Sequence, residues 1–206
     1  MRFGMAIDVS RCIGCHTCAV ACKMSNNLPD DVWWNDIHTD GGSYQDTAVG
    51  TYPNDLHRKY YPVNCQHCEN PACVEVCPTG ASFKRETDGI VAVDAETCIG
   101  CATCVSACPY GVRTILGDEL KYSVDFPVGD IDAPVHVPAT ASKCTGCVNR
   151  TSRGLPPACM ELCPARARHW GDLDDPESDI SKYLEGKTTE RLLEDSGTSP
   201  NVFYVV

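Results

Sequence analysis

Apolar residues form only short runs along this chain, and each run predicts a short element. Gly4–Val9 and Gly89–Val93 are apolar segments next to turn-forming residues, a pattern that predicts short strands. No apolar run approaches the ~20 residues that a membrane-spanning helix needs, so no transmembrane segment is expected. Short helices are predicted where small and apolar residues surround cysteines, and again near the C-terminus: Cys18–Ser25, Cys73–Cys77, Cys104–Cys108, Ala158–Cys163 and Ser178–Leu184.

Two long polar segments separate these elements. Asn26–Asn64 and Tyr110–Lys143 are rich in Gly, Pro, Asp and Tyr, which predicts loops and hairpins. Long irregular segments are uncommon in compact domains and are usually functional. We therefore expect both segments to cover a functional site or to contact a partner.

Composition and charge narrow the class of protein. The chain has 206 residues, 16 of them cysteine, and without these cysteines its apolar share falls from 43% to about 35%. The net charge of −11 argues against nucleic acid as the main partner, because phosphate binding needs a basic surface. The N-terminus shows no signal peptide. These features predict a cytoplasmic protein, or one exported to the outer face of the membrane within a prefolded complex.

The cysteines fall into four groups of four, with none left over. The first and third groups share the spacing C-x2-C-x2-C-x3-C, the second has C-x2-C-x4-C-x3-C, and the fourth contains an eleven-residue insertion. In chain order, the groups are Cys12, Cys15, Cys18 and Cys22; Cys65, Cys68, Cys73 and Cys77; Cys98, Cys101, Cys104 and Cys108; and Cys144, Cys147, Cys159 and Cys163.

The spacing of the first and third groups is that of bacterial ferredoxins, which hold [4Fe–4S] clusters. Three thiolates separated by two residues can wrap around one cluster, whereas the fourth points toward a different cluster. Structural zinc sites usually pair two C-x2-C knuckles across a longer loop and often include histidine, so zinc is the weaker interpretation. Disulfides are weaker still, because a cytoplasmic chain would not be expected to form them. The cysteines therefore predict iron–sulfur clusters.

An internal duplication supports this interpretation. Residues 12–22 and 98–108 agree at eight of eleven positions, and the second and fourth groups share the pattern P-A-C-x-E-x-C-P. The order predicts two ferredoxin-like repeats, at residues 1–93 and 94–170, followed by a C-terminal tail at residues 171–206. The predicted fold class is α+β, a duplicated bacterial ferredoxin-like fold of two 2×[4Fe–4S] modules with loop and hairpin insertions.

No catalytic motif accompanies the cysteines. The six histidines lack H-x-x-x-H spacing, and nucleotide-binding and nucleophile motifs are absent from the sequence, so we expect a noncatalytic protein. Polar neighbours of the cysteines in sequence either tune cluster potentials or are ordinary solvated side chains: Arg11, His16, Lys23, His67, Arg113 and Lys143. Likewise, Arg150 and Arg153 in the Val148–Ala158 insertion either dock a partner or are simply solvated.

Taken together, the four groups, Asp94–Val112 and the segment Ala165–Ser178 resemble a known family. The chain is similar to the four-cluster electron-transfer (beta) subunits of the dimethyl-sulfoxide reductase superfamily, which includes polysulfide, thiosulfate, arsenate and tetrathionate reductases. The resemblance implies four [4Fe–4S] clusters and a large molybdopterin (Mo or W) catalytic subunit as partner. It also implies electron relay from or to a redox partner or a membrane quinone module. A free polyferredoxin-type soluble carrier is the alternative.

The resemblance further implies that the groups pair crosswise, first with fourth and second with third, although the duplication alone suggests pairing of first with second. In the crosswise scheme, the fourth cysteine of each group joins the cluster of its partner group. The implied ligand sets are Cys12, Cys15, Cys18 and Cys163; Cys22, Cys144, Cys147 and Cys159; Cys65, Cys68, Cys73 and Cys108; and Cys77, Cys98, Cys101 and Cys104.

Overall fold

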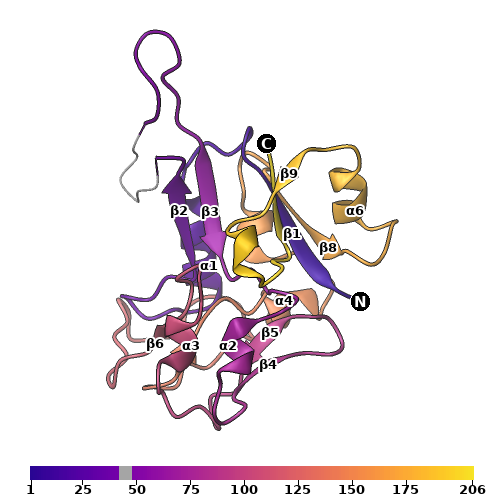
Figure 1. Cartoon of the computed structure of the whole chain (residues 1–206). Coiled ribbons are helices and arrows are strands. Elements are labelled where there is room, and N and C mark those ends of the chain that lie inside the picture. The colour runs from indigo at the N-terminus through magenta and orange to yellow at the C-terminus, as the bar shows by residue number, and fades with distance from the viewer. Residues whose placement is uncertain (42–47) are drawn as a thin grey trace.

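A computed structural model describes residues 1–41 and 48–206, and the fold is mixed α and β with short helices, as predicted. Its largest sheet has the strand order β8-β1-β10-β9 and joins the two ends of the chain (Figure 1). In this sheet, β1 (Phe3–Asp8) runs antiparallel to β8 (Arg168–Asp172) and parallel to β10 (Val202–Val205). The edge strand β9 (Thr189–Glu190) runs antiparallel to β10.

Burial of β1 between its two neighbours explains why these distant segments meet. Met5, Ala6 and Ile7 are almost completely buried, and Ile7 packs in one apolar cluster with Tyr204 of β10. The hydroxyl of Tyr204, itself fully buried, donates to the carbonyl oxygen of Pro62 at 2.9 Å. A buried hydroxyl with a partner avoids the cost of an unmade hydrogen bond, so this contact ties the sheet to the segment before the second cysteine group.

The helix α6 (Asp179–Leu184) covers β8 and was predicted one residue longer. Ser178 is its N-cap, and its Oγ accepts a hydrogen bond from the backbone N–H of Ser181 at 3.2 Å. Ile180 of α6 is fully buried and lies against Gly171, where a Cβ would come within 3.0 Å of the isoleucine side chain. The glycine therefore lets α6 approach β8 closely.

Three two-stranded antiparallel sheets lie in the two predicted loops and at the end of the first repeat. The predicted loop 26–64 contains β2 (Asn35–Thr39), which pairs with β3 (Tyr60–Asn64). The predicted loop 110–143 contains β6 (Thr114–Ile115), which pairs with β7 (Ala141–Ser142). Finally, β4 (Ser82–Lys84) pairs with β5 (Val91–Val93), which confirms the predicted strand at 89–93 with a later start.

The remaining helices are short, and most begin within a cysteine group. The predicted helices are confirmed within a few residues as α1 (Thr17–Ser25), α2 (Ala72–Glu75), α3 (Thr103–Ser106) and α5 (Ala158–Glu161). The insertion adds α4 (Val148–Thr151), and a 3-10 turn spans Glu194–Ser196. Proline after the second, third and fourth groups cannot continue an α-helix, which limits these elements to about one turn.

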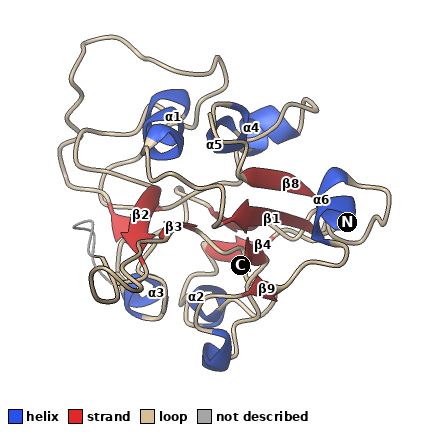
Figure 2. Ribbon diagram, turned by 90° about the horizontal axis from the view of Figure 1, so that it is seen from above, coloured by secondary structure: helices blue, strands red, loops and turns tan. Residues whose placement is uncertain are grey.

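The helices pack in pairs that cross the two sequence repeats. Helix α1 packs against α5, and α2 packs against α3. Figure 2 shows α1, α4 and α5 on one side of the large sheet, and α2 and α3 on the opposite side. The first and fourth cysteine groups therefore lie in one half of the molecule, and the second and third in the other. Among the described residues, no helix is both long and apolar enough to cross a membrane.

Candidate metal centres

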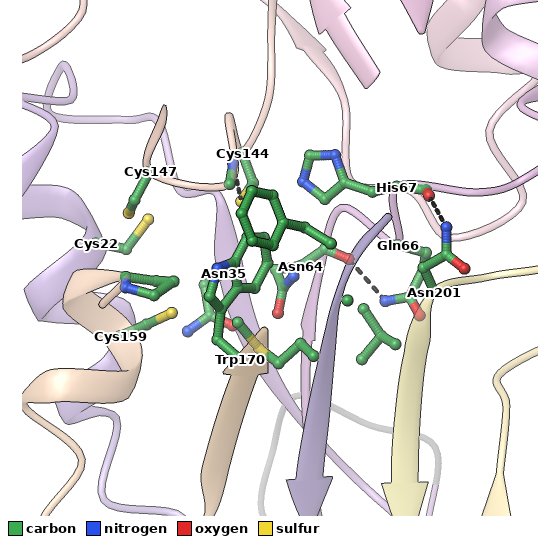
Figure 3. A pocket seen from close by; sticks show the side chains of 16 residues that line it. Cys22, Asn35, Asn64, Gln66, His67, Cys144, Cys147, Cys159, Trp170 and Asn201 are labelled. Carbon is green, nitrogen blue, oxygen red and sulfur yellow. Dashed lines mark hydrogen bonds between the residues drawn. The ribbon is translucent and has the colours of Figure 1, made fainter. Parts of the chain in front are cut away.

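Two cavities are each lined by four cysteines drawn from two distant groups. One, which we call the Cys12 cavity, is lined by Cys12, Cys15, Cys18 and Cys163. The other, the Cys22 cavity, is lined by Cys22, Cys144, Cys147 and Cys159. Figure 3 shows Cys22, Cys147 and Cys159 gathered at one end of the second cavity, with Cys144 on its wall. These two sets join the first and fourth cysteine groups.

The second and third groups also approach one another. Burial raises the pKa of Cys68 to about 12, and the neighbouring thiolates of Cys65, Cys73 and Cys108 add to this rise. Cys108 therefore lies near three cysteines of the second group, although it ends the third. In the same way, Cys77 lies close enough to Cys101 to act on its pKa. The hydrogen bond between the side chains of Thr103 and Cys101 has the larger effect and lowers the pKa of Cys101, whereas the charge of Cys77 raises it.

The cysteine sets are more widely spaced than the ligands of a single ion. Within residues 1–41 and 48–206, no three Cys, His, Asp or Glu side chains come close enough together to hold one metal ion. Tetrahedral zinc at about 2.3 Å from each sulfur needs thiolates only about 4 Å apart. A four-iron core instead lies between its thiolates, so the wider spacing fits a cluster better than a zinc ion.

Burial divides the cysteines into protected and accessible groups. Cys22, Cys147 and Cys159 are buried, whereas Cys15 and Cys101 are exposed. Burial raises the pKa of Cys159 to about 12, with the charge of Arg168 opposing that rise. A buried thiol with so high a pKa must give up its proton when it binds metal, so metal binding and folding are coupled at this cavity.

Backbone amides supply hydrogen bonds to several sulfur atoms. The N–H groups of Ser82, Ala141, Gly146 and Ala167 donate to Sγ of Cys77, Cys98, Cys144 and Cys163 at 3.3, 3.4, 3.4 and 3.4 Å. At Cys77, slight burial raises the pKa, but the Ser82 amide and other donors outweigh it and lower the pKa to about 7. Donors of this kind stabilise thiolates and are among the contacts that set the potential of an iron–sulfur cluster.

Buried groups without partners indicate that anions belong at these sites. His67 is buried, and its Nδ1 accepts from the backbone N–H of Val91 at 3.2 Å, which leaves Nε2 as the protonated nitrogen. That Nε2 and Nη2 of Arg113 have no hydrogen-bond partner among the described residues. His67 also lines the Cys22 cavity (Figure 3). An unpaired donor on the wall of a cavity lined by four cysteines fits an anionic iron–sulfur cluster.

Comparison with known proteins agrees with this chemistry. A family model described as a 4Fe–4S dicluster domain matches residues 56–120 and 133–173, and a 4Fe–4S binding domain matches residues 9–25. The iron–sulfur subunit of a provisionally named dimethyl sulfoxide reductase of Halobacterium salinarum is 44% identical over 99% of this chain and 79% of that protein.

One subunit of the tetrathionate reductase of Salmonella typhimurium is 41% identical over 99% of this chain and 72% of that protein. One chain of the polysulfide reductase of Wolinella succinogenes is 38% identical over 99% of this chain and 94% of that protein. The protein belongs to the 4Fe–4S subunits of the dimethyl sulfoxide reductase family. Like the other iron–sulfur subunits of this family, it transfers electrons and is not the catalytic subunit.

In this iron–sulfur subunit, three of the six predicted tuning residues lie beside the cysteines. His67, Arg113 and Lys143 are buried. By contrast, Arg11 and His16 are exposed. The sixth, Lys23, is half-buried, and its Nζ donates to three backbone carbonyl oxygens, those of Pro29, Asp30 and Val32, at 2.6, 3.0 and 3.2 Å. Lys23 therefore closes the loop after α1.

The structure adds one residue that the sequence did not suggest, Arg168. Its Nη1 donates to Sγ of Cys159 at 3.6 Å, and the same side chain lines the Cys12 cavity. Arg168 follows Cys163 by five positions, the same distance at which the predicted Arg113 follows Cys108, so a comparison of the third and fourth groups could have suggested it. The register of the sheet also points to it, because Arg168 pairs with Ile7, a fully buried residue of β1.

The two arginines of the insertion are paired within the chain. Arg150 contacts Asp130 at 2.9 Å and also contacts Glu161. Arg153 contacts Asp130 at 2.8 Å and Asp132 at 3.6 Å. These pairs tie the insertion to the segment before β7, and Arg153 stays exposed while it is paired.

The first cysteine loop depends on Gly14, and its replacement by alanine is expected to disrupt the Cys12 cavity. Gly14 has a φ of +65°, and a Cβ there would lie 2.3 Å from the ring of Tyr60. We expect Gly14→Ala to lower the free energy of unfolding by about 2–4 kcal/mol, from backbone strain and overpacking together. Thermal unfolding and iron content per chain measure the effect.

Gly154→Ala is the matched control for this prediction. Gly154 has a φ of +75° but has open space around its Cβ position. It shares the backbone strain without the contact with Tyr60, so a loss of only about 1 kcal/mol and full iron content are expected. Equal losses in the two variants would show that the contact with the tyrosine ring is unimportant.

Proposed function

We propose that the chain relays single electrons through four [4Fe–4S] clusters, between a molybdopterin catalytic subunit and a redox partner or membrane quinone module. The observation that carries the proposal is the pair of cavities, each lined by four cysteines from distant segments. The relatives are named as subunits or chains of reductases, which supports a committed partner over a free carrier. The bound clusters would supply one-electron chemistry, and the chain would insulate and order them.

We infer the crosswise ligand sets and name each site by one of its cysteines. The Cys12 and Cys22 sites coincide with the two cavities described above. The Cys65 and Cys98 sites are supported by the nearness of Cys108 to the second group and of Cys77 to Cys101. These two sites consist of Cys65, Cys68, Cys73 and Cys108, and of Cys77, Cys98, Cys101 and Cys104.

We further infer that the four sites follow one another in a line. Arg168 touches both cavities, which makes the Cys12 and Cys22 sites neighbours. Burial and then Cys147 raise the pKa of Cys144, and Cys65 adds to the rise, so the Cys22 and Cys65 sites are also neighbours. The inferred order is Cys12, Cys22, Cys65 and Cys98. Its two end sites carry the exposed cysteines Cys15 and Cys101, where electrons would enter and leave.

Each half of the molecule would then be one ferredoxin-like module. The packing of α1 against α5, and of α2 against α3, supports two modules that each combine both sequence repeats. The repeats at residues 1–93 and 94–170, with the tail at 171–206, would then describe the duplication of the sequence. They would not be the two modules of the folded protein. The predicted duplicated ferredoxin-like fold would thus consist of two modules, each built from segments of both repeats.

The proposal is tested on natively purified protein. We expect about 16 iron atoms per chain, four centres that titrate separately by EPR, and co-elution with a larger chain that contains molybdenum or tungsten. Zinc with little iron would contradict the iron–sulfur assignment. Four clusters on a chain that elutes alone would favour the free polyferredoxin-type carrier instead.

A further inference from the structure

Within residues 1–41 and 48–206, the interior contains three cations that no carboxylate neutralises. Arg113, Lys143 and Arg168 are 5%, 4% and 3% exposed. In the part of the chain that the structure describes, none of them has an Asp or Glu oxygen within 4.0 Å, although several surface cations do. An uncompensated buried charge costs several kcal/mol, so these cations need anions of another kind.

Arg168 shows where those anions lie. Its Nη1 donates to Asn64 Oδ1 at 3.2 Å and to Cys159 Sγ at 3.6 Å, and its Nη2 donates to Asn35 Oδ1 at 2.9 Å. Because the side chain also lines the Cys12 cavity, its charge lies between two cysteine sets. Burial would lower the pKa of Arg168, but the thiolates of Cys159 and Cys18, one from each set, raise it on balance.

Arg113 occupies the corresponding place in the other half of the molecule. Its Nη1 donates to Ser82 Oγ at 2.8 Å, and the backbone N–H of Ser82 donates to Cys77 Sγ at 3.3 Å. Burial would lower the pKa of Arg113, but Cys73 and Cys65 of the Cys65 site, and Cys104 of the Cys98 site, raise it.

Lys143 lies between these two pairs. Its Nζ donates to the carbonyl oxygen of Cys144, in the Cys22 site, at 2.7 Å, and also to that of Val91. The N–H of the same Val91 donates at 3.2 Å to Nδ1 of His67, the residue directly before Cys68 of the Cys65 site. In that site, burial raises the pKa of Cys73 to about 11, and the charges of Arg113 and Lys143 oppose that rise. Each pair of successive sites is therefore near one buried cation.

We propose that Arg168, Lys143 and Arg113 set the reduction potentials of the sites on both sides of them. Arg168 acts on the Cys12 and Cys22 sites, Lys143 on the Cys22 and Cys65 sites, and Arg113 on the Cys65 and Cys98 sites. This inference rests on the proposed function, because it requires clusters at the four sites. None of the three is a ligand; each is a positioning residue that acts through charge.

The physical reason is that one-electron reduction adds one negative charge to a buried site. A nearby cation favours the reduced state, and the effect is strong where the dielectric constant is low. Guanidinium stays charged at every physiological pH, so the two arginines act as fixed charges. A cation shared by two sites raises both potentials together, which keeps the energy step between neighbouring sites small.

Potentiometric EPR titration of the natively purified complex tests the inference. In Arg168→Gln, the reduction equilibrium of two of the four centres is expected to shift at least tenfold toward the oxidised state, about 59 mV for a one-electron couple. In Arg113→Gln, the other two centres shift by a similar amount. Lys143→Gln is expected to shift one centre from each of these pairs. Arg168→Lys keeps the charge and is expected to shift less than Arg168→Gln.

Arg166→Gln is the matched control, because Arg166 is exposed, lies two residues before Arg168 and loses the same charge. It is expected to leave all four potentials unchanged. The inference is overturned if wild type shows four centres but the Gln variants move them no more than Arg166→Gln does, or move all four equally. If Arg168→Gln loses iron, the inference is decided by the other two variants, that is, by whether Arg113→Gln and Lys143→Gln each shift two centres and have one of these in common. Fewer than four centres in wild type would contradict the proposed function instead.

Discussion

Chelating the iron of the purified chain under anaerobic, reducing conditions is expected to abolish its cooperative unfolding transition. The apolar clusters are small and are built partly from cysteines. One contains Cys18 and Cys159, and another consists of Cys147 with Ala21 and Ala158. Metal ligation would therefore bring together the segments that form these clusters. In small metal-containing domains, the free energy of metal binding is also free energy of folding.

The buried cations strengthen this expectation. Without clusters, Arg168 and Arg113 would keep their positive charges in the interior, with protonated thiols rather than anions around them. The cost of several kcal/mol for each buried charge is comparable with the whole stability of an ordinary domain. Loss of iron would thus remove attraction between segments and leave unfavourable charges behind.

Hydrogen exchange measured by mass spectrometry checks the prediction. Strands β1 and β10 should exchange slowly in the iron-loaded chain and at nearly the rate of an unfolded chain after chelation. The control is the same treatment with chelator already saturated with iron. An iron-free chain whose β1 amides stay protected would contradict the prediction and would show that the four-stranded sheet folds without metal.

Replacing single cysteines by serine is expected to show the crosswise pairing of the cysteine groups. Cys77→Ser should alter the same EPR signal as Cys101→Ser, because both belong to the Cys98 site in the crosswise assignment. Cys108→Ser should instead alter the same signal as Cys68→Ser, in the Cys65 site. Each substitution removes one thiolate, so loss or conversion of one cluster and about four fewer iron atoms at most are expected.

Cys77→Ser and Cys108→Ser are matched controls for each other. Cys77 and Cys108 are both partly exposed, and each ends its cysteine group immediately before a proline. Pairing within each group would exchange the outcomes, with Cys77→Ser acting on the signal of Cys68→Ser. That result would reject the crosswise ligand sets while leaving the number of clusters intact.

The local elements near the cysteines could be predicted because ligand spacing and proline constrain them directly. Helices α1 and α5 begin within one residue of their predicted positions for this reason. The four-stranded sheet could not be predicted in the same way. Strand β9 has two residues, and β8 (RHWGD) shows no clear alternation of apolar and polar residues. The apolar run Val202–Val205 was the available signal, but its partner lies nearly 200 residues earlier.

The residues around the cysteines were predicted as far as sequence adjacency reaches. His67, Arg113 and Lys143 lie next to or near a cysteine in sequence and are buried beside one in space. Arg168 comes near Cys18 only because β8 pairs with β1, a contact between segments about 160 residues apart. Its distance from Cys163 equals that of Arg113 from Cys108, which was a signal in the sequence, but its contact with the first group depends on the pairing of strands.

The parallel pairing of β1 with β10 also has a consequence for biosynthesis. The chain leaves the ribosome N-terminus first, so β1 must wait for this neighbour until residues 202–205 have been made. On the crosswise assignment, the Cys65 and Cys98 sites come from the continuous stretch 65–108 and could receive iron early. The Cys12 site instead waits for Cys163, which places the loading of this end of the relay after that of the Cys65 and Cys98 sites.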